Sequence, residues 1–141
     1  MPQASDWYLD IAAQVDMTDW ARGWVVLVGD AAYCASPMSG QGSSLALIGA
    51  YVLAGELAAA RGGHEAAFAE YDRAMRPFIA VNQALGIQSA QFMTRGPASA
   101  PVELSGREIE SVIERSTARI ADAAKAITLK DYSAFTAEPT G

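Results

Sequence analysis

The amino-acid sequence predicts an α/β fold that is mostly helical, with about two strands and four helices. Two short runs rich in aromatic and aliphatic residues, Trp7–Val15 and Trp24–Val28, are typical of strands. Segments with apolar residues at helical spacing fill most of the chain after Gly40. The 141 residues are the length of one domain and contain no internal repeat.

The two strand candidates differ in pattern. Trp7–Val15 alternates imperfectly and is followed by a polar connection over Asp16–Gly23. Trp24–Val28 is an uninterrupted apolar run that ends in Gly29 and Asp30. Such a run is typical of a parallel strand that is covered on both faces.

Three helices are predicted after the second strand. The first runs from Gly40 or Gln41 to Ala60, and the two glycines that follow at positions 62 and 63 stop it. A second helix covers His64–Met75 because its apolar residues recur at helical spacing. Pro77 breaks or restarts the helix, and a third helix then reaches about Met93.

The carboxyl-terminal part begins with a linker over Thr94–Leu104 that is rich in proline, alanine and serine. The last helix opens at Ser105, and Glu108 stands three residues later as a capping box requires. A single apolar stripe continues to Ile127. The chain therefore divides into residues 1–23, 24–94, 95–104 and 105–141.

Composition excludes several classes of function. Ten basic and sixteen acidic residues give a net charge of −6 with no basic run, which argues against a nucleic-acid surface. The single cysteine permits no internal disulfide and fits a reducing compartment. The amino terminus lacks the pattern of a secretory signal, so we expect a cytoplasmic protein.

A membrane-spanning helix is not expected either. Residues 31–55 carry no charge, but Pro37 and four glycines interrupt them. The uninterrupted apolar run Leu45–Ala54 is about half of the roughly 20 residues that a span needs. We therefore expect a buried core helix here.

Few residues invite a reactive or metal-binding interpretation. With one histidine and one cysteine, an ordinary zinc site is excluded within this chain. His64 is expected to cap a helix or face solvent, and Cys34 to fill a small buried space. The segment around Ser43 has neither nucleophile-elbow spacing nor the lysine of a nucleotide P-loop. The large aromatic residues are expected in the core, with a pocket for a planar substrate as the alternative: Trp7, Trp20, Trp24, Phe78 and Phe92.

The stretch from Trp24 to Gly55 carries the candidate site. A strand exit with one carboxylate, Asp30, leads through a Pro- and Gly-containing loop to a helix start, and open α/β sheets place ligands at such positions. Gly40 and Gly42 allow close backbone approach, and the free amides of the helix start carry a partial positive charge. The site thus offers one acceptor for sugar-like hydroxyls and several donors for an electron-rich group.

An ordered motif runs through this stretch: Gly29-Asp30-Ala31-Ala32, then Pro37, then Gly40-Gln41-Gly42, then an Ala- and Leu-rich helix. It resembles the second flavin motif of flavin-dependent aromatic hydroxylases, the single-component FAD monooxygenases similar to para-hydroxybenzoate hydroxylase and the tetracycline-modifying enzymes. Three positions depart from that family's pattern. Tyr33 stands where His or Arg is frequent, Ser44 where many members have Asn, and Gly49 where many have Asp.

The resemblance implies a role for each site residue. Asp30 would accept hydrogen bonds from the ribityl chain of FAD, although a turn or helix-capping aspartate is the alternative interpretation. Pro37 would lie beside the isoalloxazine ring. Backbone amides would face the flavin pyrimidine edge, where they favour the negative charge of the reduced flavin. The resulting set is Gly29, Asp30, Pro37, Gly40, Gln41, Gly42, Ser43 and Ser44, with no catalytic acid or base and no metal ligand.

The resemblance also implies an activity for a longer parent enzyme. NADH or NADPH would reduce the FAD, and one oxygen atom would pass to a small aromatic or polyketide-like substrate. Residues 1–23 would end the sheet of the substrate domain, and residues 24–94 would complete the FAD-binding domain.

The chain lacks the Gly-x-Gly-x-x-Gly loop that such an FAD site needs for the pyrophosphate. We therefore expect the carboxyl-terminal portion of a Rossmann-like monooxygenase, inactive alone, with an independent short gene product as the alternative. Open strand edges predict a homo-oligomer or a strand-exchanged dimer when the chain is isolated. A non-catalytic helical interaction module with an idle flavin loop is the competing function.

Overall fold

The computed structural model describes residues 10–94 and 105–136, which are mostly helical with two short strands. The expected fold class is confirmed. In chain order the elements are β1 (Ala21–Arg22), β2 (Val25–Val26), α1 (Asp30–Tyr33), the 3₁₀ turn η1 (Pro37–Ser39), α2 (Gly42–Ala59), α3 (His64–Thr94), α4 (Gly106–Ala124) and α5 (Ser133–Thr136).

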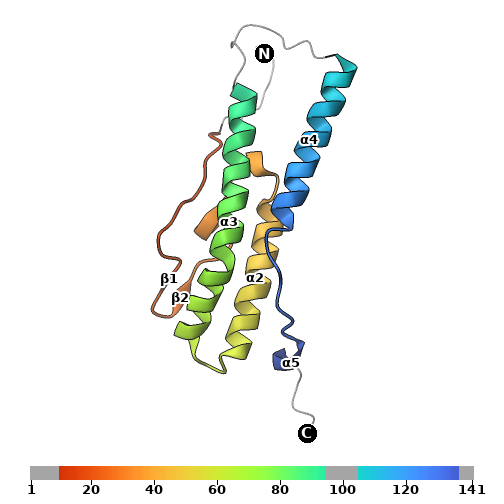
Figure 1. Cartoon of the computed structure of the whole chain (residues 1–141). Coiled ribbons are helices and arrows are strands. Elements are labelled where there is room, and N and C mark those ends of the chain that lie inside the picture. Colours follow the sequence, from red (N-terminus) through yellow and green to blue (C-terminus); the bar gives the residue numbers. More distant parts are fainter. Residues whose placement is uncertain (1–9, 95–104, 137–141) are drawn as a thin grey trace, which may run out of the picture.

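Helices α2 and α3 form an antiparallel pair at the centre of the molecule (Figure 1). The turn between them contains two residues with positive φ, Arg61 at 48° and Gly62 at 98°. Glycine adopts such a conformation without a steric penalty, so the predicted glycine stop after the first long helix is confirmed. Helix α4 packs against α3, and the carboxyl-terminal segment returns to α2 (Figure 1).

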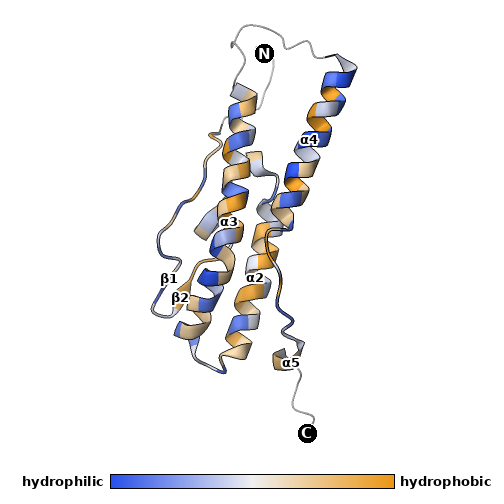
Figure 2. Cartoon of the chain, viewed as in Figure 1, coloured by the Kyte–Doolittle hydropathy of each residue, from blue (hydrophilic) through white to orange (hydrophobic). Residues whose placement is uncertain are grey.

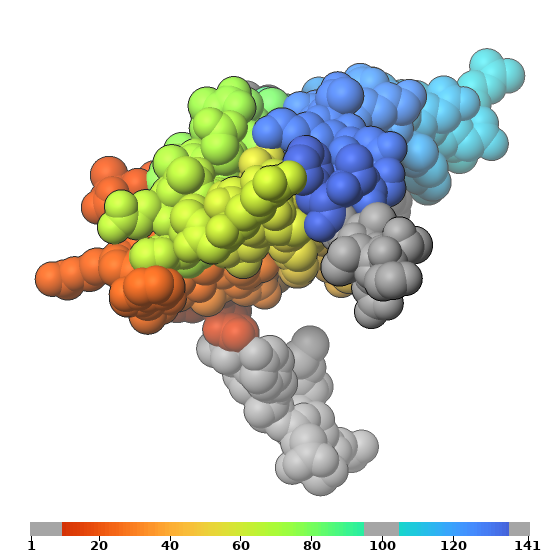
Figure 3. All heavy atoms as spheres, turned by 90° about the horizontal axis from the view of Figure 1, so that it is seen from below, coloured from red at the N-terminus to blue at the C-terminus, as the bar shows by residue number. Residues whose placement is uncertain are grey.

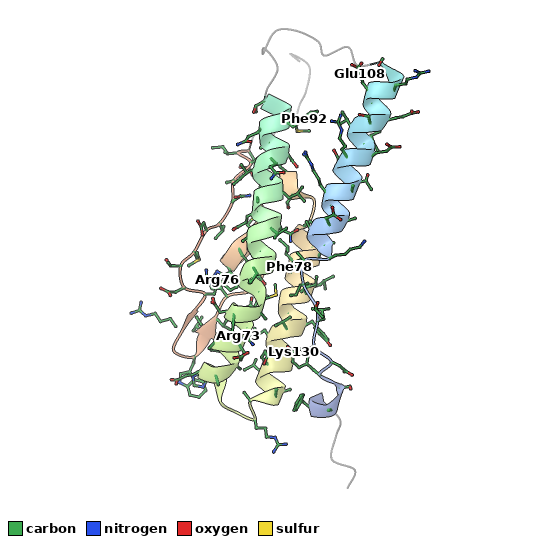
Figure 4. All side chains as sticks on the ribbon, viewed as in Figure 1. Arg73, Arg76, Phe78, Phe92, Glu108 and Lys130 are labelled. Atoms are coloured by element: carbon green, nitrogen blue, oxygen red, sulfur yellow. The ribbon has the colours of Figure 1, made fainter. Side chains whose placement is uncertain are left out.

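The hydrophobic core lies between α2, α3 and the segment that precedes α2. Phe78 of α3 is 1% exposed and lies on the side of that helix that faces α2 (Figure 4). The buried cluster consists of Trp20, Ala32, Tyr33, Ala35, Leu45, Val52, Tyr71, Met75, Phe78 and Ile79. Residues distant in sequence thus cover the loop that leads into α2.

Helix α3 is continuous over 31 residues, and the predicted break at Pro77 is wrong. A proline inside a helix removes one backbone hydrogen bond and costs about 3 kcal/mol. Buried side chains on both sides of Pro77, including Met75, Phe78 and Ile79, hold the two halves of the helix to the same core. Tertiary packing therefore outweighs the local penalty.

The strand predictions are wrong in pairing, and only the second is right in position. Residues 10–15 form no strand, and the part of the Trp7–Val15 candidate before residue 10 lies outside the described residues. Only Val25 and Val26 of the Trp24–Val28 run form a strand, and they pair antiparallel with β1 through a turn at Gly23. Val25 is 64% exposed, so this run is not a strand covered on both faces.

Two of the aromatic residues expected in the core lie at the surface. Trp24 is 81% exposed, and its ring stacks on the His64 imidazole with centroids 3.6 Å apart. Phe92 is 58% exposed near the end of α3 (Figure 4). Trp20 and Phe78 are buried as expected, and Trp7 lies outside the described residues. Cys34 is half-buried rather than buried.

Helix α2 is rich in apolar residues, and most of the side of this helix that is visible in Figure 2 is orange. Its inner face buries Leu45 and Val52, but Leu47 is 72% exposed and Tyr51 and Leu57 are also exposed. The prediction of a buried core helix therefore holds for one face. Within the described ranges, α2 is the one helix long and apolar enough to cross a membrane, a weak indication because core helices of soluble proteins have the same properties.

Helix α4 begins at the predicted capping box. The Glu108 carboxylate accepts hydrogen bonds from the backbone N–H of Ser105 at 2.9 Å and from its hydroxyl at 2.7 Å. These bonds hold the pKa of Glu108 below its usual range. Figure 2 shows alternating polar and apolar faces along α4, and Ile109, Ile113 and Ile120 of its apolar stripe remain partly exposed. The helix ends at Ala124, three residues before the predicted end.

The carboxyl-terminal segment is fastened to α2 by a buried carboxylate. Glu56 is 5% exposed and accepts hydrogen bonds from the Lys130 ammonium at 2.6 Å and the Tyr132 hydroxyl at 2.7 Å. Burial, followed by the hydrogen bond to Glu56, raises the pKa of Tyr132 above its usual range. Gly55 gives the Tyr132 ring its space, because an added Cβ would lie 2.3 Å from that ring. Figure 3 shows this segment, in dark blue, against the yellow surface of α2.

Candidate functional site

The bend after β2 places Gly29 against α2. Gly29 has φ 67° and ψ −143°, and an added Cβ there would lie 3.4 Å from the Cβ of Ala46. Only glycine combines this conformation with such a close approach at low cost. The bend is therefore held beside the amino-terminal half of α2, directly before Asp30.

Asp30 opens α1 and is exposed to solvent. Its carboxylate makes no hydrogen bond or ion pair with any other residue in the described part of the chain, and no basic residue occurs between residues 31 and 60. An unpaired carboxylate of this kind is available to accept hydrogen bonds from the hydroxyls of a ligand.

The backbone N–H groups of the loop and of the start of α2 are of two kinds: some are bonded within the chain, and others are open to a ligand. The N–H of Gly40 donates to the carbonyl of Pro37 at 3.1 Å, and the N–H of Gln41 donates to the hydroxyl of Ser39 at 3.2 Å. These two amides are therefore already used inside the chain.

The N–H groups of Gly42, Ser43 and Ser44 have no acceptor among the residues that the structure describes. All three residues are exposed, and an added Cβ at Gly42 would meet no atom within 4 Å. Because an α-helix begins with amides that have no partner within it, these groups carry partial positive charge and can donate to a ligand. The donors open to a ligand are thus fewer than the sequence predicts.

The Gln41 side chain is directed away from these open amides. Gln41 is 5% exposed, and its Nε2 donates to the carbonyl of Ile120 in α4 at 3.3 Å. The loop is thereby joined to the carboxyl-terminal end of α4. Asn82 of α3 donates to the carbonyl of Ala123 at 3.4 Å and joins the same end of α4 to α3.

A hollow of about 380 Å³ lies beside the loop, between α3 and α4. Its walls combine the residues of η1 with apolar residues that include Leu85, Phe92 and Val112. Pro37 and Gly40 contribute to the wall and are themselves exposed, so one side of the loop faces this hollow. Sequence patterns alone could not reveal this space, because its walls come from three separate elements.

Ser36, directly before the loop, has a strained backbone. Its φ of 71° and ψ of 146° are values that glycine adopts readily, and for another residue they cost about 1–3 kcal/mol. The Ser36 hydroxyl accepts from the N–H of Met38 at 3.2 Å, and its carbonyl accepts from the N–H and hydroxyl of Ser39 at 3.0 and 2.9 Å. Sequence inspection missed Ser36, because a serine before a proline carries no sign of positive φ.

A pair of tyrosines holds the base of the bend. The hydroxyls of Tyr33 and Tyr71 are 2.9 Å apart, and the Tyr71 hydroxyl donates to the carbonyl of Leu27 at 3.2 Å. Burial, followed by the hydrogen bond to Tyr33, raises the pKa of Tyr71 above its usual range, so this hydroxyl stays protonated. The Trp20 ring packs on the rings of Tyr33 and Tyr71, and the Arg76 guanidinium lies 4.4 Å from the centroid of the Trp20 ring.

The structure thus brings the predicted site residues together at one end of α2. Asp30 and the amides of residues 42–44 face solvent, whereas Gly29 and Gln41 are buried and serve packing. Pro37 lies on the exposed side of the loop. No group of three or more potential metal ligands occurs in the described ranges.

Comparison with known proteins assigns the motif to a family. The family described as FAD binding domain matches residues 4–84, more than half of the chain. A flavin-dependent monooxygenase of Legionella longbeachae serogroup 1 (strain NSW150) is 41% identical over 133 residues, which are 94% of this chain and 33% of the relative. An FAD-dependent monooxygenase of Sarocladium schorii, asL6, is 48% identical over 81 residues, which are 57% of this chain and 19% of that protein.

Two solved structures are similar as well. The crystal structure of tetracycline destructase Tet(55) superposes with a TM-score of 0.80 at 43% identity, covering 93% of this chain and 33% of that one. Tetracycline destructase Tet(51) gives a TM-score of 0.69 at 38% identity, covering 89% and 31%. The chain spans about a third of the length of these relatives.

Proposed function

The chain belongs to the FAD-binding-domain family, and we propose that it forms the side of an FAD site that contacts the ribityl chain and the isoalloxazine ring in a flavin-dependent monooxygenase. One observation carries the proposal. The exposed carboxylate of Asp30 and the three open amides of residues 42–44 lie around the same end of α2, in the order of the family motif.

The donor and acceptor types fit a flavin. Asp30 accepts hydrogen bonds from ribityl hydroxyls, because a carboxylate has only acceptor atoms. The amides of Gly42, Ser43 and Ser44 donate to the electron-rich pyrimidine edge, and the dipole of the 18-residue α2 adds positive potential there. Pro37 offers an exposed apolar ring to the flavin plane.

Bound FAD, reduced by NADH or NADPH, supplies the activation of oxygen and the transfer of one oxygen atom to an organic substrate. The residues of this chain bind and orient the cofactor and stabilise negative charge at the ring edge. No acid or base of this chain is required. Two of the similar structures are named tetracycline destructases, which supports an aromatic or polyketide-like substrate, and we place the activity in the cytoplasm.

Riboflavin tests this proposal, because it carries the ring and the ribityl chain without the pyrophosphate and adenine. Titration of the ¹⁵N-labelled chain should shift the amide resonances of residues 30 and 42–44, even where affinity is weak. Asp30→Asn should weaken binding by roughly 10- to 150-fold, since a hydrogen bond to a charged group is worth roughly 1.5–3 kcal/mol. Asp122→Asn, the same change at an exposed position of α4, is the control. Unperturbed amides at residues 42–44 would refute the proposal.

A second candidate function is a non-catalytic interaction module. The exposed side chains of Leu47 and Leu57 on α2 favour it, because exposed apolar side chains along one helix provide surface for a partner. We expect the isolated chain to self-associate through this face, to bind FAD weakly and to show no turnover. Light scattering across a concentration series measures the association. An idle flavin loop would be indicated by self-association together with unaltered flavin binding in Asp30→Asn.

A further inference from the structure

Ser36 is held in its strained conformation from both sides. Upstream, the carbonyl of Cys34 accepts from the N–H of Val15 at 3.0 Å, and the carbonyl of Ala35 accepts from Nε2 of Gln14 at 3.1 Å. Gly86 of α3 lies so close to Ala35 that a Cβ added at Gly86 would be 2.3 Å from the Ala35 carbonyl oxygen. The backbone that enters Ser36 is therefore fixed by three contacts from two segments, residues 14–15 and α3.

Downstream, Ser36 itself builds the turn that follows. Its hydroxyl and carbonyl accept the N–H groups of Met38 and Ser39, and the next bond, from Gly40 to Pro37, completes η1. Pro37 explains the extended ψ of Ser36, because a proline disfavours helical ψ in the residue before it. It does not explain the positive φ.

Glycine would adopt this conformation without strain, and the chain uses glycine at other positive-φ positions nearby, such as Gly29 and Gly40. What serine supplies and glycine cannot is the hydroxyl that fixes Met38. Strained residues that the surrounding structure holds in place concentrate at functional sites.

We propose that Ser36 is a positioning residue, whose constrained φ and hydroxyl hold the Pro37–Gly40 turn in the orientation that receives the flavin ring. This inference rests on the proposed function and deepens it. Ser36 is buried and acts through its bonds to Met38 and Ser39 in the turn that leads to α2. Gln14 and Gly86 contribute by fixing the backbone that enters it.

Ser36→Gly separates positioning from stability, because it relieves the strain and removes the hydroxyl at once. The two effects oppose each other, so the midpoint of thermal unfolding should stay within about 3 °C of the wild type. Amide exchange at residues 38–40 should accelerate about tenfold, since the turn loses its fixed start. Riboflavin affinity should fall about fivefold, because binding must then order the turn.

Arg61→Gly is the matched control. Arg61 also has positive φ, at 48°, but lies in the turn between α2 and α3. The same relief of strain should leave the exchange of residues 38–40 and the riboflavin affinity unchanged. Ser36→Ala, which keeps Cβ and loses the hydroxyl, should lower the unfolding midpoint and accelerate exchange at Met38 first.

The outcomes are distinguishable from failure of the proposed function. If Ser36→Gly keeps the wild-type amide exchange at residues 38–40 and the wild-type riboflavin affinity, the positioning role is overturned and the proposed function is not. An equal loss of affinity in Arg61→Gly would also overturn it, because the effect would then be global. Absence of riboflavin-induced shifts in the wild-type chain would refute the proposed function, and the flavin-related part of this inference would fall with it.

Discussion

Substituting Gly49 by alanine tests whether Tyr33 and Gly49 form a matched pair. Both positions depart from the family pattern, and the structure places them in contact. A Cβ at position 49 would lie 1.9 Å from the Tyr33 hydroxyl oxygen and 3.2 Å from the ring carbon that bears it. Tyr33 is 1% exposed and packs on Trp20 with ring centroids 4.8 Å apart, so it has little room to move.

The magnitude follows from three contributions. Overpacking of a rigid site costs about 1–3 kcal/mol, and displacing the Tyr33 hydroxyl from Tyr71 adds roughly 0.5–1.5 kcal/mol. Replacing a glycine inside a helix by alanine raises the free energy of unfolding by about 0.8–1 kcal/mol, which offsets part of this cost. We therefore expect Gly49→Ala to reduce the free energy of unfolding by roughly 2 kcal/mol, which lowers the unfolding midpoint by several degrees for a chain of this size.

A double-mutant cycle isolates the contact. In a Tyr33→Phe background the hydroxyl is absent, so Gly49→Ala should cost little or should stabilise the helix. The coupling energy from urea denaturation followed by circular dichroism should be about 1–3 kcal/mol. Gly106→Ala is the control, because that helical glycine has nothing within 4 Å of an added Cβ. A coupling energy near zero would show that the two residues do not constrain each other.

Three further predictions concern the supports of the fold. Replacing Glu56 by alanine removes the acceptor that fastens the carboxyl-terminal segment, and urea denaturation should show a loss of about 2 kcal/mol. Gly86→Ala should lower the free energy of unfolding by about 3 kcal/mol or more in the same assay, because the added Cβ clashes with the backbone carbonyl of Ala35. A loss below about 1 kcal/mol would show that this backbone moves to make room. Because the hydrogen bonds from Ser105 lower the pKa of Glu108, its stabilisation of the helix start is present above the ordinary glutamate pKa and is lost as pH falls through the lowered value. The protection factors of the amides at the start of α4, which are corrected for the intrinsic pH dependence of exchange, should fall over that range, and Glu108→Gln should abolish this fall.

The sequence predicts the helices well where local signals act alone. The start of α2, the glycine stop after it and the capping box at Ser105 depend on neighbouring residues, and the structure confirms all three. The break at Pro77 fails because packing of the helix on the core outweighs a local penalty. The Trp24–Val28 run fails as a buried parallel strand because its ladder partners within the described ranges are Ala21 and Arg22 alone.

The sequence indicates the acceptor of the candidate site and the helix start beside it. It does not indicate which amides are open to a ligand or which residues support the loop. Asp30 and the amides of residues 42–44 are exposed as a ligand site requires, whereas the Gln41 amide is used by Ser39. That difference depends on a side-chain hydroxyl two residues away. The supports at Gln14 and Gly86 lie 21 and 51 positions from Ala35, so no local pattern could link them to the loop.

The continuity of α3 has a mechanical consequence. At 1.5 Å per residue, its 31 residues make a rod of roughly 46 Å that joins the Trp24–His64 stack at one end to the Phe92 side of the hollow at the other. A tilt of about five degrees around its midpoint would move each end by roughly 2 Å in opposite directions. A displacement of the hairpin that tilts α3 through the Trp24–His64 stack would therefore change the width of the hollow at the other end of that helix.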